Sequence, residues 1–292
     1  MISVDEWKAG GNYFVYRNQS IFYREEGEGE VILLIHGFPS SSWDWQHQWQ
    51  ALTKRYRVVC LDLIGFGFSS KPLGYSYSLL DQADLVQHLL NYLGIESCHI
   101  LAHDYGDSVT QELLARTVDK LTTQGGSPDI KSICFLNGGL FPETHRALFS
   151  QRLLASPLGP LFAALMTSYT FKRSFSRVFG KSTQPDDATL NAYWGLIEDQ
   201  KGKRIMPALI GYMAERKVQR ERWVTAMQSG EVPLCLIVGM ADPVSGAHMA
   251  ENYRKLVPLS QVIKLEHIGH YPQVESPKIV LDSYIEFVEK QI

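Results

Sequence analysis

The feature that most constrains the fold is a short apolar run that breaks into a tight turn and continues as a helical pattern. Residues 97–102 are typical of a strand, His103-Asp-Tyr-Gly106 is typical of a turn, and residues 107–117 are helical in pattern. This is the layout of a nucleophile elbow, in which one residue is held on a strained turn between a strand and a helix. The elbow position holds Asp104, where serine is usual.

A carboxylate at this position changes the chemistry that the turn can support. Asp104 is ionised at neutral pH, so it does not have to lose a proton to a histidine before it attacks. It can attack an electrophilic carbon directly and form an ester. A histidine is then free to activate the water that hydrolyses this ester.

Strand patterns and helical patterns alternate over most of the chain, which predicts an α/β fold with a mostly parallel sheet and right-handed crossovers. We expect eight strands, with helices on both faces of the sheet. The expected strands are residues 13–16, 21–23, 31–35, 58–61, 99–102, 130–136, 234–238 and 262–265, with a turn at Asn18-Gln19-Ser20. The main expected helices are residues 43–53, 79–93, 248–256 and 278–290.

One long stretch contains helical patterns only. We expect residues 142–230 to form a helical cap, inserted after the sixth strand. Residues 1–141 and 231–292 would form the α/β core. The cap would lie over the carboxyl ends of the strands, where open parallel sheets bind ligands.

Composition narrows the classes of partner. The chain has 292 residues and a formal net charge of −3, which argues against nucleic-acid binding. No run approaches the roughly 18 apolar residues of a transmembrane helix, and the N-terminus lacks the features of a secretion signal. The four cysteines lie in strand patterns without metal-ligand spacing. We therefore expect a cytoplasmic protein with reduced thiols, no metal and no cofactor, either monomeric or homodimeric.

Two further polar residues follow strand patterns in positions that suit catalysis. Asp242 comes after residues 234–238, and His270 comes after residues 262–265. The chain order nucleophile, acid, histidine then predicts a catalytic triad of Asp104, Asp242 and His270. Asp242 would fix the tautomer of His270 and stabilise its charged form.

Another turn supplies donors for an oxyanion. The backbone N–H groups of Phe38, after the strand at 31–35, and of Tyr105 are expected to form an oxyanion hole.

These motifs resemble the α/β-hydrolase superfamily, in its epoxide hydrolase and haloalkane dehalogenase branch. The likeness extends from about Tyr13 to the C-terminus. It is carried by His36-Gly-Phe-Pro39, Asp62-x-x-Gly-x-Gly-x-Ser69, His103-Asp-Tyr-Gly106, Gly239-x-x-Asp242-Pro243 and Gly269-His-Tyr-Pro-x-x-Glu275. The resemblance implies a hydrolase that works through an aspartyl ester.

The resemblance also implies a halide site if the chain is a dehalogenase. Such enzymes commonly hold the halide with a tryptophan directly after the nucleophile and with a second N–H donor. Here these positions are Tyr105 and Phe38, which offer no side-chain N–H, although Trp194 and Trp223 remain candidates. This departure disfavours a dehalogenase, which we keep as the alternative.

Some dehalogenases also carry their catalytic acid after the strand that precedes the cap, where this sequence has Asn137. An amide cannot act as that anion, so the resemblance implies that Asp242 is the acid.

Epoxide hydrolases of this branch use cap tyrosines to protonate the oxygen of the opening ring. Tyr212 and Tyr169 lie in the expected cap and are the candidates. We therefore expect an epoxide hydrolase-like enzyme, with a small hydrophobic electrophile and water as its partners.

Two further expectations concern the cap and turnover. The charged run at residues 215–222 predicts a solvated helix face with pairs such as Lys217 and Glu221. A different class is also open, namely a hydrolase-fold protein that binds a ligand or partner without turnover.

Overall fold

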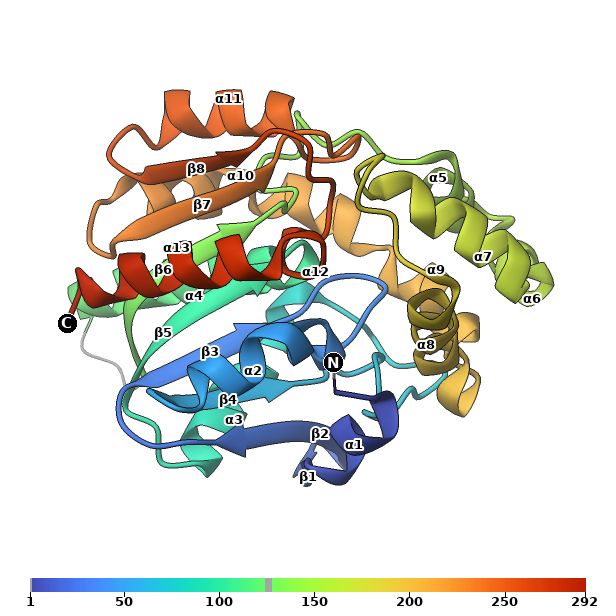
Figure 1. Cartoon of the computed structure of the whole chain (residues 1–292), viewed down its shortest axis with the longest axis horizontal. Coiled ribbons are helices and arrows are strands. Elements are labelled where there is room, and N and C mark those ends of the chain that lie inside the picture. The colour runs from blue at the N-terminus through green and yellow to red at the C-terminus, as the bar shows by residue number, and fades with distance from the viewer. Residues whose placement is uncertain (1, 124–127) are drawn as a thin grey trace.

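The computed structural model describes residues 2–123 and 128–292, and its centre is one eight-stranded sheet (Figure 1). The strand order is β1-β2-β4-β3-β5-β6-β7-β8, with antiparallel pairing for β1–β2 and β2–β4 and parallel pairing elsewhere. The strands are β1 (Asn12–Tyr16), β2 (Gln19–Glu26), β3 (Val31–Ile35), β4 (Arg57–Leu61), β5 (Ser97–His103), β6 (Asp129–Leu136), β7 (Leu234–Gly239) and β8 (Gln261–Leu265). The predicted eight-stranded, mostly parallel sheet is confirmed.

The hairpin between β1 and β2 turns one residue earlier than predicted. Tyr16 pairs with Gln19, so the two turn residues are Arg17 and Asn18, both with positive φ. Two-residue turns of this kind match the twist of hairpin strands. The preference of Asn18 and Ser20 for turns therefore located the hairpin but not its register.

Helices cover both faces of the sheet, with α2 and α13 in front and α3 and α4 behind in Figure 1. Strand β3 can be apolar and buried along its whole length because both of its faces are covered. The helices outside the β6–β7 connection are α1 (Val4–Ala9), η1 (Ser42–Trp45), α2 (Gln46–Leu52), α3 (Leu79–Tyr92), α4 (Tyr105–Thr123), α11 (Ala247–Leu256), α12 (Pro272–Glu275) and α13 (Pro277–Glu289).

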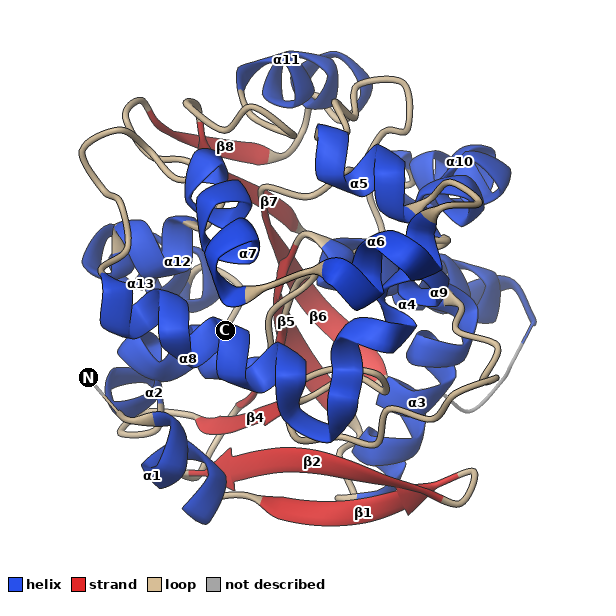
Figure 2. Cartoon of the chain, turned by 90° about the vertical axis from the view of Figure 1, so that its right-hand side faces the viewer, coloured by secondary structure: helices blue, strands red, loops and turns tan. Residues whose placement is uncertain are grey.

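The connection between β6 and β7 contains helices as its regular elements. They are α5 (Phe149–Leu154), α6 (Gly159–Leu165), α7 (Ser168–Phe175), η2 (Ser176–Val178), α8 (Asp187–Glu198), η3 (Asp199–Ile205), α9 (Met206–Leu209) and α10 (Tyr212–Gln228). Figure 2 shows α5 to α8 in front of the strands on one side of the molecule. Helix α10 packs along α4, and the indole N–H of Trp223 donates to the Glu112 carboxylate over 2.8 Å.

The four cysteines are free and buried. Burial raises the pKa of the Cys98 thiol to about 12, so its reactive thiolate form is suppressed near neutral pH.

In the described parts of the chain, no helix combines the length and the apolar character needed to cross a bilayer.

Gly106 is expected to tolerate no side chain, because the helix after the elbow starts directly against β3. A Cβ atom at Gly106 would lie 2.5 Å from the carbonyl oxygen of Ile35 and 2.7 Å from that of His36. We expect Gly106→Ala to lower the free energy of unfolding by about 1–3 kcal/mol in urea titrations, as overpacking usually does.

Gly195 provides the matched control within a helix. It lies in α8, and a Cβ atom there would meet nothing within 4 Å. Gly195→Ala should therefore raise the free energy of unfolding by about 0.5–1 kcal/mol. A similar loss of stability in both variants would contradict the packing described for the elbow.

Candidate active site

Asp104 lies on a strained turn between β5 and α4. Its φ is +47°, in the left-handed region that residues other than glycine rarely adopt, and its side chain is buried. The backbone N–H of Asp104 donates to the carbonyl of Leu136 at the end of β6 over 3.2 Å. Neighbouring strands thus hold the turn in a conformation that costs free energy by itself, a common property of functional positions.

One of the two predicted oxyanion donors contacts the carboxylate directly. The backbone N–H of Phe38, in the loop after β3, donates to Oδ2 of Asp104 over 3.1 Å. Tyr105 is the first residue of α4, and the first N–H groups of a helix have no partner within it. The ring of Tyr105 packs edge-on against that of Tyr212, with 5.2 Å between centroids.

His270 and Asp242 form a buried pair at the ends of neighbouring strands. Nδ1 of His270, after β8, lies 2.8 Å from Oδ2 of Asp242, after β7. Asp242 also accepts from the backbone N–H groups of Val244 over 2.7 Å and Ser245 over 3.1 Å. A carboxylate with this many donors is stabilised in its charged form.

Asn137 joins the loops after β6 and β7. Its Nδ2 donates to Asp242 over 2.9 Å and to the carbonyl of Gly239 over 3.0 Å, and its Oδ1 accepts from the Gly239 N–H over 2.7 Å. Asn137 therefore holds the carboxylate of Asp242, the residue predicted as the acid.

The electrostatics of the three groups are linked. Burial opposes the charged form of His270, but attraction to Asp242, the hydrogen bond between them and attraction to Asp104 outweigh it and raise its pKa to about 9. Burial also opposes the Asp104 anion, but Arg216 and His270 outweigh it and lower the Asp104 pKa. The site therefore favours a state in which Asp104 and Asp242 are negatively charged and His270 is positively charged.

His103 beside the site is neutral. Its Nε2 lies 2.7 Å from the carbonyl oxygen of His270, and burial together with repulsion from His270 lowers its pKa to about 3. His103 therefore packs against His270 and forms a hydrogen bond beside the site without carrying a charge.

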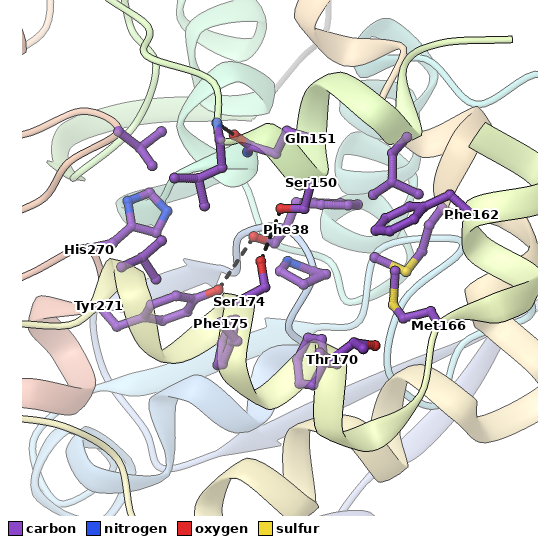
Figure 3. A pocket seen from close by; sticks show the side chains of 17 residues that line it. Phe38, Ser150, Gln151, Phe162, Met166, Thr170, Ser174, Phe175, His270 and Tyr271 are labelled. Atoms are coloured by element: carbon purple, nitrogen blue, oxygen red, sulfur yellow. Dashed lines mark hydrogen bonds between the residues drawn. The ribbon is translucent and has the colours of Figure 1, made fainter. Parts of the chain in front are cut away.

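A mostly apolar cavity lies between the sheet and the helical connection (Figure 3). His270 and Tyr271 lie on one side of it, and Phe162 and Met166 lie on the opposite side. The lining residues are Phe38, Pro39, Leu148, Ser150, Gln151, Leu154, Phe162, Met166, Thr170, Phe171, Ser174, Phe175, Val178, Met206, Val244, His270 and Tyr271. A small hydrophobic molecule suits such a cavity.

The structure brings one of the two predicted tyrosines to the site. Tyr212 is buried at the start of α10 and is not itself a lining residue, but it contacts two residues that are. Its hydroxyl lies 3.5 Å from the amide nitrogen of Gln151, and its ring centroid lies 5.8 Å from that of Phe38. Burial and the Asp104 charge raise the Tyr212 pKa. Tyr169 lies elsewhere: it is 69% exposed and does not line the cavity, because α7 turns Phe171 and Phe175 inward instead.

The predicted tryptophans do not line the cavity either. Trp194 is half-buried and packs against Phe171 from outside the lining, with ring centroids 5.5 Å apart. Trp223 directs its indole N–H to Glu112 on α4. The Trp223 N–H is therefore not available to a halide beside Asp104.

The sequence missed Arg216, which lies next to the predicted nucleophile. Its Nη2 donates to the Asp104 carbonyl over 2.9 Å and lies 3.4 Å from Oδ1 of the same residue, and its Nε donates to Ser108 over 2.7 Å. The guanidinium also lies 4.5 Å from the ring centroid of Tyr212. Arg216 is 2% exposed, so the predicted solvated face at residues 215–222 is wrong at this position.

Glu215 departs from the predicted solvated face as well. Its carboxylate accepts from the backbone N–H groups of Leu79 over 2.7 Å and Leu80 over 3.3 Å. These are the first two residues of α3, where a negative charge is favoured by the helix dipole. The neighbouring residues 215 and 216 therefore both fasten α10 to the core.

Comparison with known proteins identifies the family. The α/β hydrolase fold family matches residues 30–277. The chain belongs to this family. The mesoderm-specific transcript protein of Mus musculus is 41% identical to it over 98% of this chain and 88% of that protein. Haloalkane dehalogenase 2 of Mycobacterium bovis is 24% identical over 91% of this chain and 90% of its own length.

A solved structure of another protein has the same fold as this chain. The epoxide hydrolase CorEH has a TM-score of 0.79 with 17% identity, covering 97% of this chain and 99% of its own.

The raised pKa of His270 predicts a pH dependence of stability. A folded-state pKa of about 9, above the ordinary 6.5, means that the stabilisation is complete below pH 6.5 and is lost as the pH rises through 9. We expect NMR titration of labelled histidine to show this high pKa, and Asp242→Asn to lower it. A His270 pKa at or below 6.5 in the unaltered protein would contradict the pairing.

Arg216 is expected to stabilise the fold by compensating the buried Asp104 charge. Arg216→Leu should lower the free energy of unfolding at pH 7 by about 3–5 kcal/mol, because a buried carboxylate loses its partner. Arg220→Leu, on the same helix but in an exposed pair with Glu143, should cost about 0–1 kcal/mol.

A second variant and the pH dependence isolate the charge effect. Adding Asp104→Asn to Arg216→Leu should restore part of the lost stability, since no unpaired anion remains. Because the folded pKa of Asp104 is lowered, the Arg216 contribution is present above the ordinary pKa of 3.8 and is lost as the pH falls. Equal costs for the Arg216 and Arg220 variants would contradict this account.

Proposed function

We propose that this α/β hydrolase is a cofactor-free hydrolase that uses Asp104 as its nucleophile and acts on epoxides. The observation that carries the proposal is the placement of the Asp104 carboxylate, on a strained turn and bonded to the Phe38 N–H, beside the His270–Asp242 pair. His270 and Phe38 also line the apolar cavity, which suits a small hydrophobic electrophile. In this proposal the helices of residues 142–230 act as a cap that closes the cavity.

The first step is attack on carbon. A carboxylate oxygen of Asp104 forms a bond to an epoxide carbon, and the bond between that carbon and the ring oxygen breaks. The ring oxygen takes the phenolic proton of Tyr212, which water later replaces. The burial of Tyr212 and the contact of its hydroxyl with Gln151, a residue of the cavity lining, support this role.

The second step is hydrolysis of the ester. His270 takes a proton from water, and the resulting hydroxide adds to the carboxyl carbon of Asp104. The N–H groups of Phe38 and Tyr105 hold the oxyanion, and one such donor is typically worth about 3 kcal/mol. When the intermediate collapses, the diol leaves with the proton from His270. The carboxyl proton left on Asp104 passes through water to the Tyr212 phenolate, which regenerates both groups.

Loss of the Asp104 charge favours the second step. His270 has a raised pKa in the free enzyme partly because Asp104 is negative nearby. Conversion of Asp104 to a neutral ester removes that attraction and lowers the His270 pKa. The imidazole thus becomes available as a base once the ester exists, as general base catalysis near neutral pH requires.

The alternative of haloalkane hydrolysis is supported by the relationship to haloalkane dehalogenase 2. It is disfavoured by the donors at the site, because neither Phe38 nor Tyr105 has a side-chain N–H. Four tryptophan N–H groups are used elsewhere, those of Trp7, Trp43, Trp49 and Trp223.

The proposal predicts a trapped intermediate in the absence of the base. His270→Gln, incubated with styrene oxide, should accumulate one covalent adduct on the peptide that contains Asp104, detected by mass spectrometry. The variant with both His270→Gln and Asp104→Asn is the blank. Tyr212→Phe added to His270→Gln should slow adduct formation by about 10²–10⁴-fold, the usual contribution of a general acid.

The outcomes separate the possible activities. An adduct elsewhere or no adduct contradicts an Asp104 nucleophile for epoxides. Halide released from 1-bromobutane by the unaltered protein, without diol from styrene oxide, would assign the dehalogenase activity instead.

A further inference from the structure

The helices α5 to α7 expose large apolar side chains on the outer side of the cavity wall. Five such residues are between 59% and 79% exposed, and they are Phe149, Leu158, Leu161, Leu165 and Tyr169. A soluble protein rarely keeps a group of large apolar side chains in water unless the surface has a function. We call this surface, residues 144–181, the α5–α7 plate.

The plate has two apolar faces. In α6, Phe162 lines the cavity and Met166 follows the helix into the lining, while Leu161 and Leu165 point outward and are exposed. Figures 1 and 2 both place α5, α6 and α7 on the same outer side of the molecule. The cavity wall and the exposed apolar surface are therefore opposite faces of the same short helices.

The charge of the plate differs from that of the chain. The whole protein has 28 lysines and arginines against 31 aspartates and glutamates, yet residues 144–181 of the plate hold six basic residues and no acidic one. The six are Arg146, Arg152, Lys172, Arg173, Arg177 and Lys181. Within the described parts of the chain, only Lys172 of these six has a carboxylate within 4 Å, that of Asp187 at 3.9 Å.

Two basic residues on the neighbouring helix α10 have carboxylate partners. On α10, Arg220 pairs with Glu143 and Arg222 pairs with Asp119. Five of the six positive charges of the plate thus have no carboxylate within 4 Å among the described residues, whereas Arg220 and Arg222 of α10 are paired within the fold. A surface of exposed apolar side chains among unpaired cations matches an anionic lipid interface, which offers both negative headgroups and an apolar layer.

We propose that the α5–α7 plate docks this protein on the surface of an anionic lipid bilayer. The apolar side chains enter the boundary between headgroups and acyl chains, and the basic side chains remain among the headgroups. A second copy of the chain is a poor occupant, because a symmetric dimer through this surface would bring like charges together.

Docking would also deliver substrate. An apolar substrate dissolved in the bilayer would meet the cavity wall directly, without passing through water. This part rests on the proposed function, since it assumes a hydrophobic substrate in the cavity. The docking itself does not depend on catalysis.

Vesicle co-sedimentation of the full chain tests the proposal. With sucrose-loaded phosphatidylcholine vesicles containing about 30 mol% phosphatidylserine, we expect most of the protein in the pellet at low salt. Binding should fall in phosphatidylcholine alone and at about 0.5 M NaCl, where the Debye length is short.

Matched variants locate the surface. Phe149→Ser/Leu161→Ser/Leu165→Ser and Arg173→Gln/Arg177→Gln/Lys181→Gln should each weaken partitioning by about tenfold or more. The control is Val15→Ser/Val218→Ser/Leu259→Ser, which removes exposed apolar residues elsewhere and should leave partitioning unchanged. Melting temperatures within a few degrees of the unaltered protein show that the variants fold.

The outcomes separate docking from catalysis. Asp104→Asn should partition like the unaltered protein, while adduct formation with water-dispersed styrene oxide reports on the proposed function alone. Equal binding to neutral and anionic vesicles, no binding to either, or the same loss in the control variant as in the plate variants would overturn the docking proposal.

Discussion

The structure depends on the compensation of one buried negative charge. The Asp104 carboxylate is removed from water, which by itself would favour its neutral form. Positive charge and dipoles from separate parts of the chain reverse this: the Phe38 N–H after β3, Arg216 on α10 and His270 after β8. Parallel strands make this possible because their carboxyl ends meet at one edge of the sheet.

Arg216 links the helical connection to the charge at the elbow. It lies on α10 together with Tyr212. Arg216 donates a hydrogen bond to the Asp104 carbonyl, and its guanidinium lies over the ring of Tyr212, whose pKa is raised by the Asp104 charge. A displacement of α10 would therefore change both the charge state of Asp104 and the position of the proposed proton donor. In the proposed mechanism, the same helix positions the acid and stabilises the nucleophile.

The sequence predicted the sheet and the residues at its strand ends because these depend on local patterns. Apolar runs ending at Asp104 and Asp242 are sufficient to place both side chains at the same edge. Arg216 could not be found from charge alone, since a run of charged residues usually faces water. Its spacing from Tyr212 and Trp223, four and seven residues apart on a helix, was the available signal for a buried face. Tyr169 shows the converse, because Phe171 and Phe175 at helical spacing occupy the inner face of α7.

The most direct test of the account is the origin of the oxygen in the product. In a single turnover in ¹⁸O-labelled water with enzyme in excess over an epoxide, attack by Asp104 predicts a diol that carries unlabelled oxygen from the carboxylate. The label should then appear in the Asp104 peptide, as mass spectrometry can detect. Label in the diol of the first turnover, with none in Asp104, would mean that water attacks the substrate directly and would contradict the account.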